Sequence, residues 1–161
     1  VAESTRVPVG RRFATIVTSA AGHPLDKTYY QTVKGMVTPL DILAPGGTLI
    51  VASACSEGFG SPEFRAAQGR LRSLGPDAFL QTLLAKSLAD VDEWQTEMQL
   101  KSMRAGHVQL YTTGLDDEER SLTGVESIAS IDAALAAAVA RAGDPAIAVV
   151  PEGPYVVPVV G

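Results

Sequence analysis

The sequence predicts an α/β fold in which a mainly parallel sheet lies between layers of helices. Short apolar segments rich in β-branched residues alternate along the chain with longer segments of helical periodicity. Glycine and proline occur at the joins between them. Strands separated by helices form βαβ units, whose parallel sheets are covered on both faces. The expected architecture is therefore three-layered, of the Rossmann or flavodoxin-like kind.

Four segments have the length and composition of buried strands. They are residues 13–19 (FATIVTS), 48–54 (TLIVASA), 107–112 (HVQLYT) and 146–150 (AIAVV), and residues 155–160 are predicted to add a short last strand. Aliphatic and β-branched side chains dominate in them, as is typical of strands buried on both faces. The Pro-Gly-Gly segment at 45–47 is predicted to form the turn before the second strand.

Helical periodicity fills the intervals between these strands. The expected helices run from about residue 26 to Pro39, from Pro62 to about residue 86 with a break at Gly75-Pro76, from about residue 91 to 105, and from residue 131 to Gly143. Ser130 is placed to cap the last helix, and Asp26 is expected to cap the first. The acidic segment at 116–120 is interpreted as a solvated loop.

Length and charge limit the function classes open to the chain. Its 161 residues and 16.8 kDa suit one compact domain, taken as residues 1–161. The net charge of −5 and the scattered basic residues argue against nucleic acid or an anionic membrane as the partner. No apolar segment approaches the roughly 20 residues of a membrane span. The single cysteine, Cys55, excludes an internal disulfide and suits a reducing cytoplasm.

The first helix carries the most informative polar pattern. Helical spacing places four polar residues on one face, opposite an apolar stripe: Lys27, Tyr30, Gln31 and Lys34. This face follows a strand-end loop, and ligands of parallel α/β sheets bind outside the carboxyl ends of the strands. An ammonium and a carboxamide suit a small 2-hydroxy acid, with Lys34 on the carboxylate and Gln31 able to donate and accept. The alternative is a solvated polar face without a ligand.

Other candidate sites have weaker patterns. Gly58-Phe-Gly60 is a two-glycine fragment of a phosphate loop that lacks a third glycine and a Gly-Lys-Ser/Thr ending. A nucleotide-binding domain that uses residues 55–60 stays open as an alternative. His23 and His107 lie far apart, and no carboxylate in the sequence is placed to orient either, so we expect no metal site made by this chain alone. Cys55 is interpreted as a small packing residue.

The only tryptophan has two interpretations. Trp94 aligns with Met98 on its helix, and this periodicity favours a place in the core. An indole at the mouth of a site could instead form a wall against a planar cofactor, because its flat ring stacks well and excludes water.

Several segments occur in an order that resembles the C-terminal part of one family. The segment TSAAGHPLD (18–26) is similar to Ser-x-Gly-Gly-Tyr-Pro-Leu-Asp, and YYQTVKG (29–35) matches a Tyr-Gln-x-x-Lys helix; then follow PGG (45–47), CSEGFG (55–60), EWQ (93–95) and a Val-Pro-x-Gly ending from Val150. These features resemble the nickel-dependent lactate racemases. The first two segments are the more specific, and the resemblance covers nearly the whole chain.

The resemblance implies a racemase or epimerase of 2-hydroxy acids that works by hydride transfer to a nickel-pincer nucleotide. Gln31 and Lys34 match the family's substrate-holding residues, and Tyr30 matches a residue that lines the site. Trp94 matches a residue near the cofactor. The catalytic histidines and the groups that hold the cofactor belong to an N-terminal domain outside this sequence. This chain is therefore expected to supply no catalytic or metal-binding residue and to be inactive alone.

Two departures from the family pattern lie in the loop nearest the expected substrate. Ala21 stands where the family usually has glycine, and His23 where it usually has tyrosine. They suggest a 2-hydroxy acid other than lactate, because loop changes alter pocket shape while leaving a carboxylate anchor intact. The main alternative function is a non-catalytic flavodoxin-like module that senses a carboxylate or docks another protein.

Overall fold

The structure is a computed structural model that describes residues 6–161. Five parallel strands form the central sheet, in the spatial order β5-β4-β3-β2-β6. Their bounds are Phe13–Ser19 for β2, Leu43–Ala52 for β3, His107–Tyr111 for β4, Glu126–Ser127 for β5 and Ile147–Val150 for β6. The chain moves outward from β2 to β5 and then crosses to the other side of β2, as in doubly wound α/β folds. The predicted α/β class is confirmed.

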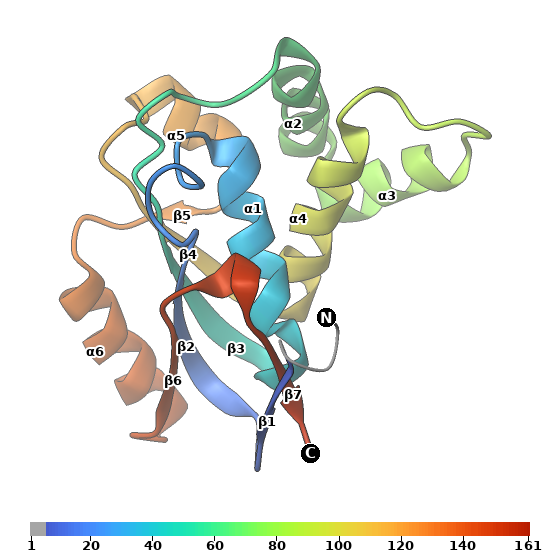
Figure 1. Cartoon of the computed structure of the whole chain (residues 1–161). Coiled ribbons are helices and arrows are strands. Elements are labelled where there is room, and N and C mark those ends of the chain that lie inside the picture. Colours follow the sequence, from blue (N-terminus) through green and yellow to red (C-terminus); the bar gives the residue numbers. More distant parts are fainter. Residues whose placement is uncertain (1–5) are drawn as a thin grey trace.

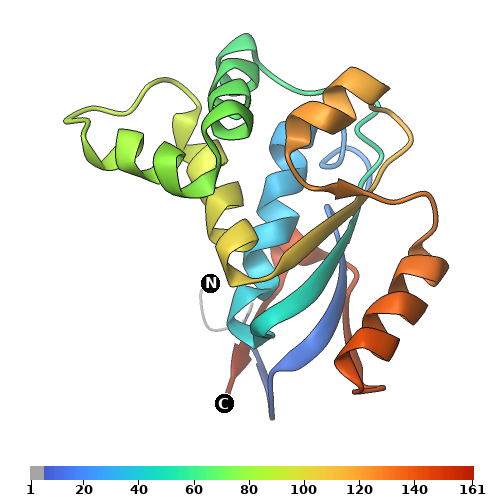
Figure 2. The same cartoon turned by 180° about the vertical axis from the view of Figure 1, so that it is seen from behind.

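Helices cover the sheet unequally (Figures 1 and 2). One side carries α1 (Tyr29–Val37) and α4 (Glu93–Ala105), and the other carries α6 (Ile131–Ala142). The remaining helices are α2 (Pro62–Leu74), α3 (Pro76–Leu84) and α5 (Asp117–Thr123), with short 3-10 turns η1 (Thr38–Ile42) and η2 (Gly153–Tyr155). Helix α3 projects from the body of the domain (Figure 1). Among residues 6–161, no helix combines the length and apolarity needed to cross a membrane.

Local signals in the sequence account for most element boundaries. Ser61 caps α2 by accepting the Phe64 N–H at 3.1 Å, and Pro62 opens the helix. Ser130 caps α6, and Gly143 ends it in the left-handed conformation. The predicted break at Gly75-Pro76 separates α2 from α3.

A second, two-stranded sheet was not predicted from the sequence. Strands β1 (Arg6–Val9) and β7 (Val157–Val160) pair in parallel beside the main sheet. The Val160 N–H also donates to the Asp41 carboxylate at 3.0 Å, which ties β7 to η1. The last predicted strand therefore exists, but its partner is the first segment described rather than the central sheet.

Three expectations are corrected. The segment at 116–120 begins helix α5, with Asp116 as its N-cap, because Asp116 and Glu119 form a capping box. Thr28, not Asp26, caps α1; the Asp26 carboxylate instead accepts the Ala54 N–H at 3.1 Å. The predicted turn at 45–47 lies within β3, as an irregularity where the partner in β3 jumps from Leu43 to Thr48.

A buried polar layer joins four helices above the sheet. The Tyr29 hydroxyl donates to Gln99 Oε1 at 2.7 Å, and Gln68 Nε2 donates to the same oxygen at 2.8 Å. Gln99 Nε2 donates to the Thr123 carbonyl at 2.6 Å. Burial raises the pKa of Tyr29 well above its ordinary value, so the phenol stays neutral and able to donate. The layer links α1, α2, α4 and α5 in one network.

Candidate functional site

Two strand-end loops meet at the start of α1. The Cys55 N–H donates to the Asp26 carbonyl at 2.8 Å, and the Glu57 N–H donates to the Lys27 carbonyl at 2.7 Å. The Gly58 N–H is bound by the Cys55 carbonyl at 2.9 Å. Because these three N–H groups already have acceptors, they are not free to bind a phosphate, which argues against the nucleotide-binding alternative.

The same contact satisfies the amino end of α1. The N–H groups of Tyr29 and Tyr30 donate to the carbonyls of Gly58 and Phe59, each at 3.0 Å. Gly60 has φ 123°, and a Cβ there would lie 2.9 Å from the Tyr30 Cβ. The loop after β3 therefore packs its backbone against the first turn of α1 and fixes where Tyr30 lies.

A hollow lies at the carboxyl edge of the sheet, where ligands of such sheets usually bind. Its volume is about 600 Å³, and its lining includes Ser19, Ala52, Tyr111 and Pro151 from the ends of four strands. Ala21, one of the departures from the family pattern, also lines it and adopts φ 66°. Tyr30, Gln31, Lys34 and Trp94 are not among its lining residues. The predicted substrate face is thus distinct from this hollow.

Tyr30 lies at the centre of the predicted substrate face. Its ring packs edge-on against Phe64, with centroids 5.2 Å apart, and edge-on against Trp94, with centroids 6.1 Å apart. Its hydroxyl donates to the Asp92 carboxylate at 3.3 Å. Burial and the neighbouring Asp92 raise the pKa of Tyr30, so this phenol remains protonated at neutral pH. Tyr30 also lines a hollow of about 370 Å³ together with Ser61 and Asp92.

Gln31 and Lys34 follow Tyr30 on the same helix. The Lys34 amine lies 6.0 Å from the centroid of the Tyr30 ring, within the range of a cation–π contact. Lys34 is exposed, Gln31 is half-buried, and in the described part of the chain no carboxylate lies within ion-pair distance of Lys34. Neither residue lines the hollow of about 600 Å³ or the one of about 370 Å³. The chain thus presents this amine and amide on an open surface.

Lys27 does not share that face as the spacing predicted. Helix α1 begins at Tyr29, two positions later than Lys27. The Lys27 amine instead forms an ion pair with Glu57 at 2.6 Å.

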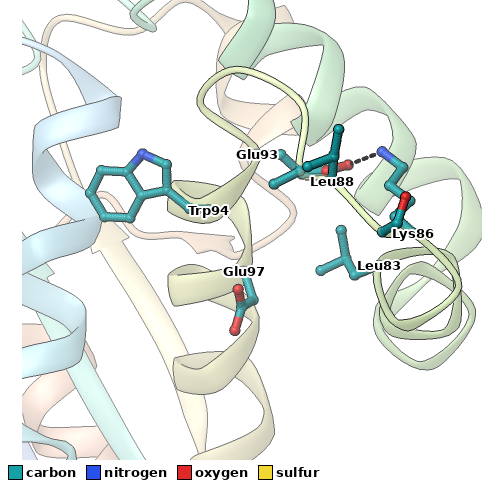
Figure 3. Close-up of a pocket in the computed structure, with 8 residues that line it drawn as sticks. Leu83, Lys86, Leu88, Glu93, Trp94 and Glu97 are labelled. Carbon is teal, nitrogen blue, oxygen red and sulfur yellow. Dashed lines mark hydrogen bonds and ion pairs between the residues drawn. The ribbon is translucent and has the colours of Figure 1, made fainter.

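Trp94 is on the surface, and its predicted place in the core is wrong. The residue is 45% exposed, and its indole extends from α4 toward α1, away from Leu83 and Leu88 (Figure 3). It borders a groove of about 220 Å³ between α4 and the α3–α4 connection. The face that α4 buries is mostly polar, because Gln95, Thr96 and Gln99 are buried there beside Leu100. On this turn of α4, the apolar residue Trp94 is therefore the exposed one.

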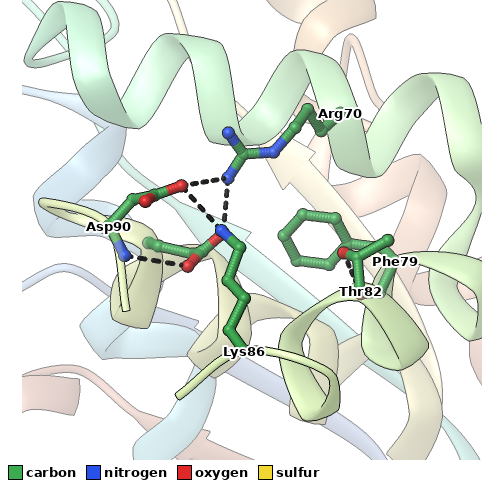
Figure 4. A network of polar contacts seen from close by, with 6 residues as sticks. Arg70, Phe79, Thr82, Lys86 and Asp90 are labelled. Atoms are coloured by element: carbon green, nitrogen blue, oxygen red, sulfur yellow. Dashed lines mark hydrogen bonds and ion pairs between the residues drawn. The ribbon is translucent and has the colours of Figure 1, made fainter. Parts of the chain in front are cut away.

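A network of ion pairs attaches the α3–α4 connection to α2 and to the first turn of α4 (Figure 4). Glu93 is 2% exposed; its Oε1 accepts from Lys86 at 2.7 Å and from Arg70, and its Oε2 accepts the Asp90 N–H at 3.0 Å. Burial would raise the pKa of Glu93, but the Lys86 and Asp90 hydrogen bonds and the nearby cations outweigh it and lower the pKa.

The weaker candidates lie away from this face. Cys55 is fully buried, with its thiol 3.4 Å from the Thr32 hydroxyl, in keeping with a packing role. Glu126 lies 2.5 Å from the His107 ring, so a carboxylate does orient His107, contrary to the expectation from the sequence. His107 begins β4 and is thus at the edge opposite the strand-end loops. Within residues 6–161, no three metal-binding side chains form a cluster.

Comparisons with known proteins identify the family. Residues 11–158 match the family model described as "Lactate racemase C-terminal domain". The chain belongs to the lactate racemase C-terminal domain family. It is 27% identical over 140 residues to the lactate racemase of Lactiplantibacillus plantarum, an alignment covering 85% of this chain and 32% of that protein. It is 29% identical over 85 residues to the lactate racemase of Thermoanaerobacterium thermosaccharolyticum, covering 52% and 20% respectively.

A solved structure shares the fold of this chain. The lactate racemase apoprotein from T. thermosaccharolyticum superposes with a TM-score of 0.80 at 22% identity. The match covers 92% of this chain and 36% of that one. The chain therefore spans between a fifth and about a third of the length of these relatives.

Asp92 is the residue of this face that the sequence did not single out. It lies at the amino end of α4 and contacts Tyr30 on α1, which is 62 positions away. No local pattern signals such a contact, because it depends on how two helices and a loop meet in space.

Proposed function

We propose that residues 1–161 form a single C-terminal domain that holds the substrate of a 2-hydroxy acid racemase or epimerase. The observation that carries this proposal is the exposed Lys34 amine, which lies over Tyr30 and one helical turn from Gln31, without a carboxylate partner in the described chain. A free amine beside an amide suits a carboxylate with a neighbouring hydroxyl. The parent protein would be an isomerase, as its lactate racemase relatives are by name.

The exposed aromatic surface fits a planar cofactor bound by the rest of the protein. Trp94 and Tyr30 meet edge-on beside Lys34, so flat apolar surface and a positive charge adjoin one another. We expect this group to be bound mainly by an N-terminal domain of the parent protein. When bound, a nickel-pincer nucleotide would supply the hydride acceptor of the racemisation.

This chain would bind and orient the substrate and exclude water. Lys34 would neutralise the carboxylate, and Gln31 would donate to it or accept from the hydroxyl. Covering the open face with the N-terminal domain would desolvate these groups and strengthen their interactions. We place the protein in the cytoplasm, where its one buried free thiol needs no oxidising compartment.

Loss of the Lys34 amine in the full-length enzyme tests this assignment. Lys34→Ala should weaken substrate binding by about 2–5 kcal/mol, which is roughly thirtyfold to several thousandfold in the dissociation constant, because the substrate carboxylate would lose its partner in a covered site. Racemisation of a panel of 2-hydroxy acids and substrate binding would be measured with cofactor-loaded protein. The matched control is Lys101→Ala, which removes an exposed amine paired with Glu97 on α4.

Unchanged binding and turnover in Lys34→Ala would reject the substrate-holding role. The isolated chain should not racemise any 2-hydroxy acid, and turnover by it would refute the division of work between two domains. If the full-length protein binds a 2-hydroxy acid without racemising it, the carboxylate-sensing alternative is favoured instead.

A further inference from the structure

Asp92 occupies an unusual backbone conformation for its position. It is the N-cap residue of α4, with φ 59° and ψ 1°, in the left-handed region that favours glycine. An aspartate at an N-cap normally accepts a hydrogen bond from an N–H in the first turn of its helix. The Asp92 side chain makes no such bond. The position thus lacks the usual stabilisation of an aspartate cap while keeping a conformation unfavourable to a side chain.

The carboxylate is directed toward two other elements. Asp92 Oδ2 accepts from the Ser61 hydroxyl at 2.6 Å, at the start of α2. Asp92 Oδ1 accepts from the Tyr30 hydroxyl at 3.3 Å, on the first turn of α1. Both contacts border the hollow of about 370 Å³ that these three residues share. Ser61 holds one oxygen by a short bond, so the other is fixed in place to receive the phenol.

A positive and a negative group lie at different parts of the Tyr30 side chain. Lys34 lies over the ring, at 6.0 Å from its centroid, whereas Asp92 lies at the hydroxyl. The other charged group lining that hollow is Glu57, which is paired with Lys27 at 2.6 Å. A 2-hydroxy carboxylate on this face would be attracted by Lys34 and repelled by Asp92. The two charges would therefore orient the acid along the ring.

We propose that Asp92 is a positioning residue of the substrate face: its carboxylate fixes the Tyr30 phenol and sets which way the substrate carboxylate points. The inference rests on the proposed substrate-holding function of Tyr30, Gln31 and Lys34. Asp92 is not expected to touch the reacting atoms. Its effect passes through the Tyr30 ring, which in turn packs against Trp94.

The contact can be tested in this chain without any cofactor or substrate. Carbon-13 labelling of the tyrosine rings, with Tyr30→Phe to assign the signal, would follow the ionisation of Tyr30 by NMR. Asp92→Asn should lower the pKa of Tyr30, because the negative charge that opposes the phenolate is removed. Asp132→Asn, an equal change of charge on α6 across the sheet, should leave it unchanged. An unaltered Tyr30 pKa in Asp92→Asn would overturn the proposal.

Asp92→Gly separates positioning from folding. Glycine accepts the left-handed backbone and is tolerated at an N-cap, so the thermal midpoint should hold or rise while the Tyr30 signal shifts. A large drop in the midpoint, with no shift of Tyr30, would mean that Asp92 acts on the fold alone and would overturn the proposal.

The kinetic consequence is a split between kcat and KM in the cofactor-loaded full-length enzyme. Asp92→Asn should lower kcat roughly tenfold through misorientation. KM should not rise, because a repulsion is removed. A raised KM with unchanged kcat would contradict the proposal. Lys34→Ala, measured in parallel, shows which proposal fails. If Lys34→Ala has no effect on the kinetics, the proposed substrate-holding function is rejected. If Lys34→Ala has a large effect but Asp92→Asn has wild-type kinetics, only the role of Asp92 is rejected.

Discussion

The ion network around Glu93 allows a quantitative test in the isolated chain. Glu93→Gln keeps the size of the side chain but removes its charge and places an amide where two cations now donate. The buried carboxylate accepts from Lys86 at 2.7 Å, from Arg70, and from the Asp90 N–H at 3.0 Å. These contacts attach the α3–α4 connection to the first turn of α4 (Figure 4).

The expected loss follows from the exposure of each partner. Hydrogen bonds to charged groups contribute a net of about 1.5–3 kcal/mol each when buried. The side chains of Arg70 and Lys86 are 41% and 31% exposed. Water can therefore solvate these two cations when the Glu93 carboxylate is removed, which reduces the loss of stability. We therefore expect Glu93→Gln to lower the free energy of unfolding by about 2 kcal/mol in total, well below the sum of separate bonds. For a domain of this size that corresponds to a fall of about 4–8 °C in Tm.

The stability lost in Glu93→Gln should become smaller as the pH falls. The folded-state pKa of Glu93 lies below its ordinary value of 4.5. The contribution of the Glu93 charge to the free energy of unfolding is therefore fully present above pH 4.5. It disappears as the pH falls through the lower pKa of the folded state. The gap between wild type and Glu93→Gln should be full at neutral pH and narrow in acid.

Urea unfolding followed by far-ultraviolet circular dichroism would measure both quantities. The control is Glu97→Gln one turn later, whose side chain is 43% exposed and pairs with Lys101 at 3.4 Å. That change should cost less than about 0.5 kcal/mol. Equal losses in the two variants, or a gap for Glu93→Gln that persists unchanged at low pH, would refute the reasoning.

Substitutions at three further positions test a buried hydrogen bond, a close backbone approach and a helix cap. Tyr29→Phe removes the buried donor to Gln99 and should cost about 1–2 kcal/mol in urea unfolding; a neutral result would mean that this bond adds nothing. Gly35→Ala should lower Tm by several degrees, because its Cβ would lie 2.7 Å from the rigid Ser19 carbonyl; an unchanged Tm would contradict that close approach. Ser130→Ala removes the cap of α6 and should cost about 1 kcal/mol, whereas Ser130→Gly should cost only a few tenths; equal costs would argue against capping.

Elements bounded by strong local signals were predictable from the sequence. Strand β2 has the predicted bounds Phe13–Ser19, because a β-branched run stands between small residues. Helix α6 lies between a serine cap and a glycine stop. In contrast, β1 depends on a partner about 150 positions away, and no short-range pattern indicates such a pairing.

Two errors had different causes: the acidic residues 116–118 do face water, but as the start of a helix, whereas polar residues of α4 are buried. The acidic run at 116–120 was interpreted as a solvated loop, but its Asp116–Glu119 capping box begins a helix, and Arg65 pairs with Glu119 at 3.1 Å. On α4 most buried residues are polar, with Leu100 as the apolar exception, and Trp94 is left outside. Periodicity reports where apolar residues recur, and it fails where a helix buries hydrogen-bonded polar groups.

The substrate face was predictable in part. Tyr30, Gln31 and Lys34 occur within two turns of one helix, so spacing alone predicts that they share a surface. Their roles remain predictions from the family resemblance. The neighbourhood of Trp94 and the contact with Asp92 come from the tertiary packing of α4 against α1, which spacing does not encode.

The buried polar layer of Tyr29, Gln68, Gln99 and Thr123 restricts how α4 can move. Apolar contacts have no preferred direction, so a helix seated only on aliphatic side chains can slip or rotate slightly at little cost. Each amide in this layer has donors and acceptors at set angles, and a small rotation of α4 would break several of them at once. Replacing the layer by leucine could give a domain that melts at a higher temperature. The orientation of the Trp94 side chain relative to Tyr30 would then no longer be fixed.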